Sequence, residues 1–453
     1  MNEPLPVENA TPIERLARPF QEFAKLEASG GILLIGCTII ALAWANSPLA
    51  ESYHHLWHTN LTFGFAGAQL SEPLHFWIND GLMALFFLLV GLEIKRELLV
   101  GELASPQKAA LPIAAALGGM LVPAGIYALF NSGGPGSSGW GIPMATDIAF
   151  ALGVLALLGD RVPLSLKIFL AALAIADDVG AVVVIAGFYT ANISWTSLAI
   201  AGVFLAALVM MNRAGARHPL IYAVLGLGLW LGFLQSGIHA TVAGVLLAIT
   251  IPSRERLDRG TFLSRSEKVL GEFRSADDVS DNIIASATRT ATLHVLAEDC
   301  KRAESPMLRF EHALTPWIKH VVMPVFALAN AGVALGGETV SALTNRVGLG
   351  VICGLALGKP IGIVTFSWFA TRTKLAAMPA NSSWRQILAV GMLAGIGFTM
   401  SLFIANLAFG DAPLLETAKV GILAASVVSG VAGVIILIRS KATTPLTGIT
   451  PIQ

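Results

Sequence analysis

Residues 174–187 read AIADDVGAVVVIAG and place two adjacent carboxylates, Asp177 and Asp178, inside an apolar run. An ionisable group near the centre of a bilayer costs at least about 2.5 kcal/mol, so such groups are usually retained there for a function. Neighbouring residues on a helix are rotated by about 100°, so these side chains cannot share one partner, but both can border one cavity. The stretch therefore predicts a membrane-spanning helix that carries a charged site.

The whole chain has the composition of a membrane protein. Of its 453 residues, 55% are hydrophobic and 13% are charged, whereas soluble domains carry about 25% charged residues. We therefore predict an all-α polytopic membrane protein. The formal net charge is zero, which gives no support to nucleic acid as a partner. Cys37, Cys300 and Cys353 are too few and too scattered for a disulfide framework or a zinc site.

Apolar runs long enough to cross about 30 Å of hydrocarbon recur along the chain. We expect about twelve spans, near residues 29–46, 75–92, 109–130, 140–158, 164–187, 194–211, 219–235, 238–251, 314–335, 347–370, 386–409 and 418–438. Lys and Arg gather in alternate connections, which predicts that both termini are cytoplasmic. The expected parts are a cytoplasmic N-terminal segment 1–28, spans one to eight within 29–251, a cytoplasmic hydrophilic loop 252–310, spans nine to twelve within 311–438, and a cytoplasmic tail 439–453.

Two polar segments stand apart from the spans. Residues 59–72 alternate Leu61, Phe63 and Phe65 around glycines, which predicts a β-hairpin on the outer side. Residues 252–310 are polar and of mixed charge, which favours a solvated linker over a docking module. Within that loop, residues 282–304 carry a weak helical signal.

Five ionisable residues lie in apolar surroundings: Asp80, Asp147, Asp177, Asp178 and Lys359. They could serve only as buried ion pairs between helices. Four acids against one base, however, leave an excess of negative charge, which protons or cations must neutralise or water must solvate. Carboxylate oxygens are hard ligands that suit a small, hard cation. Adjacent carboxylates also titrate as a coupled pair. Such a site can exchange protons for a cation.

Residues 139–153, GWGIPMATDIAFALG, predict an interrupted span. Pro143 breaks the run, and Thr146 followed by Asp147 has the character of a new helix N-terminus, where a hydroxyl caps free N–H groups and an acid meets the helix dipole. A simple proline kink is the alternative.

Residues 393–403, LAGIGFTMSLF, predict a second interruption in the other half of the chain. Gly395 and Gly397 loosen this span, and Thr399 is placed to cap the part that follows. Paired interruptions in corresponding positions of two halves point to a binding site at a repeat interface.

The tenth span carries glycines at four-residue spacing, which leave a smooth face for close helix contact; they are Gly350, Gly354, Gly358 and Gly362. Lys359 lies next to this face and is expected to pair with an aspartate when no cation is bound. A buried lysine is also a candidate proton carrier.

Two further features are ambiguous. His239 in SGIHATVAG is more typical of a core or interfacial histidine than of a pH switch. The cluster Glu93, Lys95, Arg96 and Glu97 in GLEIKREL fits ordinary interface anchoring as well as pH sensing.

Several of these segments together resemble the NhaA-type Na+/H+ antiporters. The matching segments, in the family's order, are WINDGLMALFFLLVGLEIKREL, ATDIAFALGVLALLG, AIADDVGA, GIHATVAGV, GKPIGI and GIGFTMSLFIA. The resemblance covers about 28–439, apart from roughly 253–308, where the insert before RFEHAL is longer than the family pattern.

The resemblance implies electrogenic, pH-regulated exchange of Na+ or Li+ for protons by alternating access, without a cofactor or enzymatic activity. It implies twelve helices, with spans three to five and ten to twelve as an inverted repeat whose interrupted helices cross. Asp177 and Asp178 would bind the ion near Thr146, Lys359 would pair with the first aspartate, and Asp147 would offset partial charges at the crossing. The implied pH-sensing residues are Glu93, Arg96, Glu97, His239, Glu311 and His312.

The resemblance also implies a homodimer in the bacterial inner membrane, joined through the hairpin near 59–72. Two other functions are open. An intramembrane aspartyl protease is disfavoured because GIGF lacks the acid of a GxGD-type signature and Asp160 lies at a membrane edge. A passive cation channel is disfavoured because paired carboxylates, a partnering lysine and interrupted repeats suit stepwise exchange.

Overall fold

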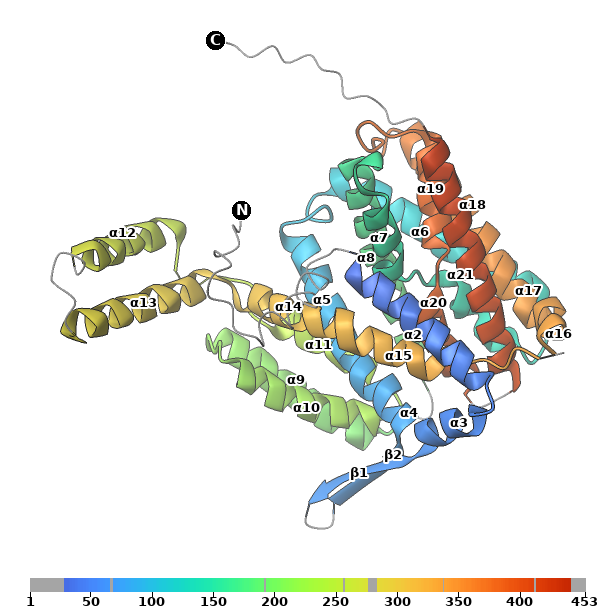
Figure 1. Ribbon diagram of the computed structural model, residues 1–453, viewed down its shortest axis with the longest axis horizontal. Helices are drawn as coiled ribbons and strands as arrows, with labels where there is room; N and C mark the ends of the chain where they lie inside the picture. The colour runs from blue at the N-terminus through green and yellow to red at the C-terminus, as the bar shows by residue number, and fades with distance from the viewer. Residues whose placement is uncertain are drawn as a thin grey trace, which may run out of the picture. The chain divides into compact units, whose positions relative to one another are not determined.

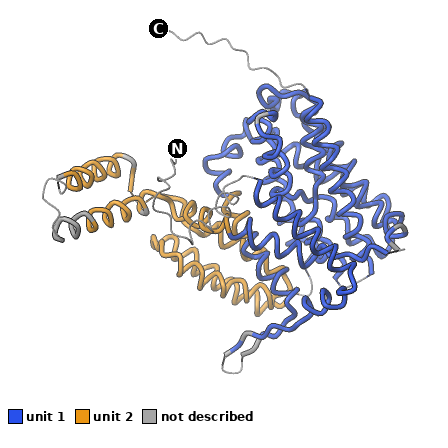
Figure 2. The backbone as a smooth tube through the Cα atoms, in the orientation of Figure 1, with its two compact units in different colours: residues 1–86, 94–191, 317–453 blue, residues 87–93, 192–316 orange. Residues whose placement is uncertain are grey.

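The computed structural model describes residues 28–65, 68–190, 193–255, 257–275, 283–336, 338–410 and 413–440 (Figure 1). These residues are mainly helical, and the backbone divides into two compact units, shown in Figure 2. Unit 1 comprises residues 1–86, 94–191 and 317–453, and unit 2 comprises residues 87–93 and 192–316. The helix α5 (Met83–Leu99) contributes to both, since only its central part belongs to unit 2.

Unit 1 holds most of the elements, including all those that carry the interrupted spans. Its elements are α2 (Ser29–Ala45), α3 (Ala50–His58), β1 (Asn60–Phe65), β2 (Ala68–Pro73), α4 (Leu74–Phe76), η2 (Trp77–Leu82), α6 (Pro106–Asn131), η3 (Ser137–Met144), α7 (Ile148–Leu157), η4 (Gly159–Arg161), α8 (Leu164–Phe188), η5 (Ile318–Val322), α15 (Met323–Asn330), α16 (Glu338–Thr344), α17 (Arg346–Cys353), η6 (Gly354–Gly358), α18 (Lys359–Arg372), α19 (Trp384–Ala394), α20 (Phe398–Phe409) and α21 (Pro413–Arg439).

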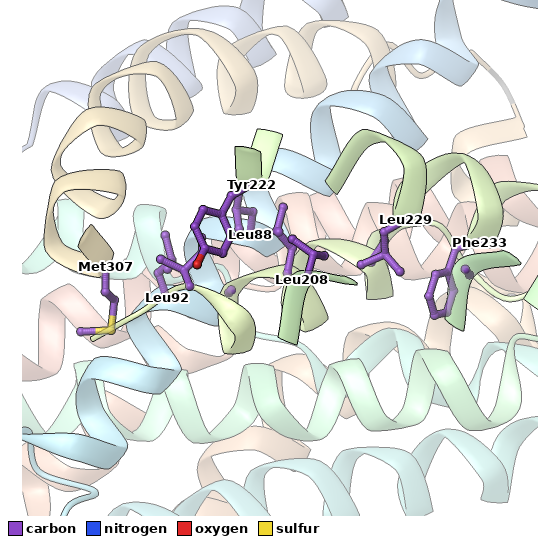
Figure 3. Close-up of a cluster of buried hydrophobic side chains, with 12 residues drawn as sticks. Leu88, Leu92, Leu208, Tyr222, Leu229, Phe233 and Met307 are labelled. Carbon is purple, nitrogen blue, oxygen red and sulfur yellow. The ribbon is translucent and has the colours of Figure 1, made fainter. Parts of the chain in front are cut away.

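Unit 2 is built from helices around one apolar cluster. Its elements are α9 (Trp195–Arg213), α10 (Pro219–Leu234), α11 (Thr241–Thr250), α12 (Arg259–Ser275), α13 (Ile283–Ala303) and α14 (Pro306–Trp317). Figure 3 shows its core, a cluster that includes Leu88 and Leu92 of α5, Leu208 of α9 and Leu229 of α10, with Met307 of α14 at one end. The burial of these side chains joins helices that are far apart in the sequence.

The helices have the length and composition of an all-α membrane protein. Among the described residues, seven helices are long and apolar enough to cross a bilayer, and two bent helix pairs raise the number to nine if each pair is one span. The helices α10 and α11 are apolar but shorter. The expectation of twelve spans therefore stays a prediction.

The hairpin predicted near 59–72 corresponds to β1 and β2, which pair antiparallel with Asn60 opposite Pro73 and Phe65 opposite Ala68. A hydroxyl contact of 2.7 Å between Thr62 and Ser71 supports the register.

The insert contains two helices over its described residues. The helices α12 and α13 lie side by side (Figure 1), and Arg265 Nε of α12 lies 3.2 Å from the buried Asp299 Oδ2 of α13. An i, i+4 pair between Glu298 and Arg302 supports α13. The helix α13 (Ile283–Ala303) lies within the weak helical signal at 282–304, and the preference for a solvated linker over a docking module stays a prediction.

Proline residues follow two π-helical turns in unit 1. Pro324 follows η5, and Pro360 follows η6. A proline lacks the backbone N–H and crowds the carbonyl four residues earlier, so the preceding turn widens. The widened turn η6 ends directly before Lys359.

The ninth predicted span ends earlier than its hydropathy suggests. The helix α15 stops at Asn330, although apolar residues continue to 335. The hydroxyl of Tyr53 donates to the carbonyl of Leu328 (2.8 Å) and accepts from the N–H of Gly332 (3.1 Å). These bonds satisfy the helix end and the extended chain that follows it.

Candidate functional site

Two helix interruptions in unit 1 are hydrogen-bonded to each other. One lies between η3 and α7, and the other lies between α19 and α20, a pair bent by 45°. The backbone N–H of Asp147 donates to the carbonyl of Ile396 (2.7 Å), and the hydroxyl of Thr146 donates to the carbonyl of Ala394 (3.0 Å). Each interruption therefore supplies partners for backbone groups that the other leaves outside a helix.

The carboxylate of Asp147 joins the starts of two helices. Its Oδ1 accepts from the N–H of Phe150 at the start of α7 (3.0 Å). Its Oδ2 accepts from the N–H of Thr399 (3.1 Å) and from the Thr399 hydroxyl (2.5 Å) at the start of α20. An acid with 1% exposure thus meets the positive ends of two helix dipoles.

A buried ion pair lies beside this junction. The ammonium of Lys359 donates to Asp177 Oδ2 (2.6 Å) and to the Thr146 hydroxyl (2.8 Å). Lys359 is fully buried and Asp177 is 1% exposed. The arrangement brings together three of the residues that the sequence predicted, from α8, from α18 and from the first interruption.

The two adjacent aspartates both lie inside α8. Asp178 is also 1% exposed, and it follows Asp177 on the helix that packs against α6 and α7. The second oxygen of Asp177, Oδ1, has no hydrogen-bond partner among the described residues. A buried carboxylate oxygen without a donor is free to take a proton or a cation.

The helix caps differ from those expected. Asp147 rather than Thr146 is the capping residue of α7, because the Thr146 hydroxyl is used by Ala394 and Lys359. Thr399 does not cap α20, since its hydroxyl donates to Asp147, and Gly397 stands at the capping position without a side-chain bond. Pro143 lies inside the short 3-10 helix η3, and Gly395 follows α19 directly.

Two serines at the interruptions were missed by the sequence analysis. The hydroxyl of Ser401 donates to the carbonyl of Ile142 (2.8 Å), near the end of η3. The hydroxyl of Ser426 on α21 accepts from the N–H of Phe398 (3.2 Å), at the start of α20. A polar side chain inside an apolar run was the available signal, because a buried hydroxyl requires a partner.

The pH-sensing candidates are not part of this cluster. In unit 1, Arg96 and Glu97 form an ion pair of 3.3 Å, and Glu97 also accepts from the N–H of Glu102. In unit 2, Glu93 lies on α5, His239 precedes α11, and Glu311 and His312 lie on α14. His312 contacts Glu304 (3.0 Å), a residue of the insert that the sequence analysis did not single out.

The site offers oxygen atoms of mixed type. The described residues contain no group of three or more His, Cys, Asp and Glu side chains placed to hold a metal ion. An ion here would be held by the two aspartates together with hydroxyl or backbone oxygens, of which Thr146 is nearest to the ion pair. Small, hard cations prefer such oxygen ligands.

We expect Asp147→Ala to lower the free energy of unfolding by at least about 2 kcal/mol. It removes the acceptor of the buried Thr399 N–H and hydroxyl and of the partly buried Phe150 N–H, and an unpaired buried polar group costs about 1–3 kcal/mol. The measurement is the denaturation midpoint of the purified protein in detergent. Unfolding is monitored as the loss of the monodisperse peak on size-exclusion chromatography.

Asn345→Ala is the matched control for this prediction. Asn345 caps α17 through one bond to the N–H of Val347 (3.1 Å), outside the interruptions. Loss of an ordinary cap costs about 1 kcal/mol. Equal losses in Asp147→Ala and Asn345→Ala would show that Asp147 is no more than a helix cap.

The known proteins that this sequence resembles are Na+/H+ antiporters. The sequence matches the family described as Na+/H+ antiporter 1 over residues 21–437. A Na(+)/H(+) antiporter NhaA from Oleidesulfovibrio alaskensis is 50% identical over 426 residues, which cover 94% of this chain and 95% of the relative. Another from Koribacter versatilis is 50% identical over 433 residues, covering 96% and 94%. A Na(+)/H(+) antiporter NhaA 2 from Syntrophotalea carbinolica is 50% identical over 428 residues, covering 94% and 98%. The chain therefore belongs to the Na+/H+ antiporter 1 family, a family of membrane transporters and not of enzymes.

Proposed function

We propose that this chain exchanges Na+ or Li+ for protons electrogenically, by alternating access, at Asp177 and Asp178. The single observation that carries the proposal is the buried contact of 2.6 Å between Lys359 and Asp177, beside a second aspartate and an interrupted helix. A lysine that neutralises the site when it is empty must give way when a cation arrives. Competition between an ammonium, protons and a metal ion for the same oxygens is the basis of exchange.

Charge counting supports electrogenic exchange. With protons on Lys359 and Asp178 and none on Asp177, the charges of the three groups sum to zero. When one Na+ replaces those two protons, the three groups carry two negative charges and the ion one positive charge, so the loaded site carries one net negative charge. One charge then crosses per cycle, and a potential of about 100 mV supplies roughly 2.3 kcal/mol for each. A difference of one pH unit adds about 1.4 kcal/mol per proton.

The arrangement of helices supports alternating access through inverted repeats. Each half of unit 1 contains a long helix, an interrupted helix and a second long helix. In the first half these are α6, η3 with α7, and α8; in the second half they are α17 to α18, α19 with α20, and α21. We infer that these two sets are spans three to five and ten to twelve, and that one bundle tilts to present the site on either side of the membrane.

The proposal includes the setting of the molecule. We infer a homodimer in the bacterial inner membrane, with both termini in the cytoplasm, the β1–β2 hairpin as a contact between copies, and no bound cofactor. We also infer regulation by pH through Glu93, Arg96, Glu97, His239, Glu311 and His312. Arg96 and Glu97 form an ion pair and His312 contacts Glu304, so charged or ionisable groups lie next to each other in these segments.

The test measures how far Na+, Li+ or K+ dissipates a pH gradient across everted membrane vesicles. Dequenching of an acridine dye reports the loss of the gradient. Wild-type vesicles should respond to Na+ and Li+, and Asp178→Asn vesicles should not, because the amide cannot exchange a proton for a cation. Asp258→Asn removes an exposed aspartate outside the spans and should respond as the wild type does. An undiminished response of Asp178→Asn would show that the site is assigned to the wrong residues.

The alternative functions have distinct signatures. Family membership gives no support to an intramembrane protease, and Asp160 is not needed for the proposed exchange. A passive channel would carry currents far above carrier rates in reconstituted vesicles and would show no obligatory proton movement. Exchange instead requires that the Na+ flux and the proton flux stop together in Asp178→Asn.

A further inference from the structure

A cavity of about 640 Å³ opens in unit 2, where the insert meets the other helices of that unit. Its walls come from the α9–α10 connection, from the end of α13 and from the start of α14. The charged or titratable residues of its lining are Arg217, His218, Glu298, Arg302, Glu304 and Arg309. The cavity is many times larger than the roughly 30 Å³ that one water molecule occupies.

Three arginines and two glutamates line this cavity, and two of the arginines have no carboxylate partner among the described residues. Glu298 lies 3.3 Å from Arg302, and Glu304 lies 3.0 Å from His312. Among the described residues, neither Arg217 nor Arg309 forms an ion pair with a carboxylate, although Arg217 donates to the backbone carbonyl of Glu255 (3.3 Å). The lining thus keeps uncompensated positive charge.

Two helix N-termini add to this positive field. Pro219 begins α10 and Pro306 begins α14, and both residues line the cavity. Neither helix has an acidic residue in its first turn. The N-terminus of a helix carries partial positive charge, so anions are favoured there.

We propose that this cavity binds a water-soluble anion with several phosphate-type groups, independently of the ion exchange at Asp177 and Asp178. The guanidinium groups of Arg217 and Arg309 provide the paired donors that phosphate oxygens accept. The wall contributed by α13 is hydrated, since the side chains of Glu298 and Arg302 are 54% and 39% exposed. This hydration favours a soluble anion over the headgroup of a membrane lipid.

The experiment is isothermal titration calorimetry of the full-length protein in detergent with inorganic pyrophosphate, at constant ionic strength. We expect saturable binding to the wild type. We expect the affinity to fall at least about tenfold in Arg217→Gln and in Arg309→Gln, because each loses charge-assisted hydrogen bonds. Arg254→Gln, which removes an exposed charge outside the cavity, should keep the wild-type affinity.

Further arms separate specific binding from the alternatives. Arg309→Lys keeps the charge without the two-pronged donor and should retain part of the affinity, which distinguishes lost contact from lost folding. Absence of saturable pyrophosphate binding, or an equal loss in Arg254→Gln, would overturn the proposal. So would an arginine-dependent stabilisation by short-chain phosphatidylglycerol without any by pyrophosphate, because the cavity would then hold a lipid headgroup. No arm measures transport, so failure here is distinguishable from failure of the exchange mechanism.

Discussion

Asp177→Asn is expected to abolish Na+-dependent proton movement and to destabilise the protein by up to about 3–5 kcal/mol, the usual cost of removing one partner of a buried ion pair. The variant leaves the ammonium of Lys359, which is fully buried, without the carboxylate that lies 2.6 Å away. Transport fails for a second reason, since the neutral asparagine lacks the negative charge with which Asp177 would hold the cation. Both effects are measured on one preparation, by thermal unfolding in detergent and by dye dequenching in proteoliposomes.

The double variant Asp177→Asn/Lys359→Met separates these two effects. It removes both charges, and replacement of a buried ion pair by uncharged groups is often neutral or even stabilising. We therefore expect the double variant to regain much of the stability that Asp177→Asn loses, with a coupling of at least about 1 kcal/mol, while transport stays absent. Additive losses of stability in the two single variants and the double variant would contradict a coupled pair.

Much of the helical framework was predictable because hydropathy and length constrain a helix that crosses hydrocarbon. The expected spans 164–187 and 347–370 correspond to Leu164–Phe188 and to Arg346–Arg372. The expectation failed where a tertiary contact decides the helix end, as at Asn330, where the Tyr53 hydroxyl bonds the chain just beyond α15. A residue so distant in the sequence leaves no local signal.

The charged residues of the site were predictable, but most of their neutral partners were not. Two aspartates in an apolar run are recognisable in the sequence, because burying charged groups in a membrane is costly and such groups are usually retained for a function. The carbonyls of Ala394 and Ile396 bond Thr146 and Asp147 through the backbone, which every residue type presents, so no side chain indicated them. Ser426 gave only a weak signal, because a serine in a membrane helix can also bond to its own backbone.

The glycine spacing of the tenth span predicted a close helix contact without naming the partner. The partner is α6: a Cβ added to Gly362 would meet the backbone of Gly118, and one added to Gly358 would meet Pro123. Small residues let two membrane helices approach until their backbones touch. This contact matters to the site because α18, the helix that carries Gly362, begins with Lys359.

Gly118→Ala is therefore expected to lower the free energy of unfolding by about 1–3 kcal/mol or more, which is the usual cost of overpacking. We also expect it to reduce Na+/H+ exchange, because it displaces α18. The added Cβ would overlap the carbonyl of Gly362, which is backbone and cannot move aside as a side chain can. Gly125→Ala is the matched control on the same helix, because a Cβ there has no atom within 4 Å. It should be neutral or stabilise by up to about 1 kcal/mol, since alanine favours a helix more than glycine does. Both variants are measured by thermal unfolding in detergent and by Na+-driven dequenching. Equal stability of Gly118→Ala and Gly125→Ala would contradict the prediction, because it would show that the contact between α6 and α18 accommodates an added methyl group.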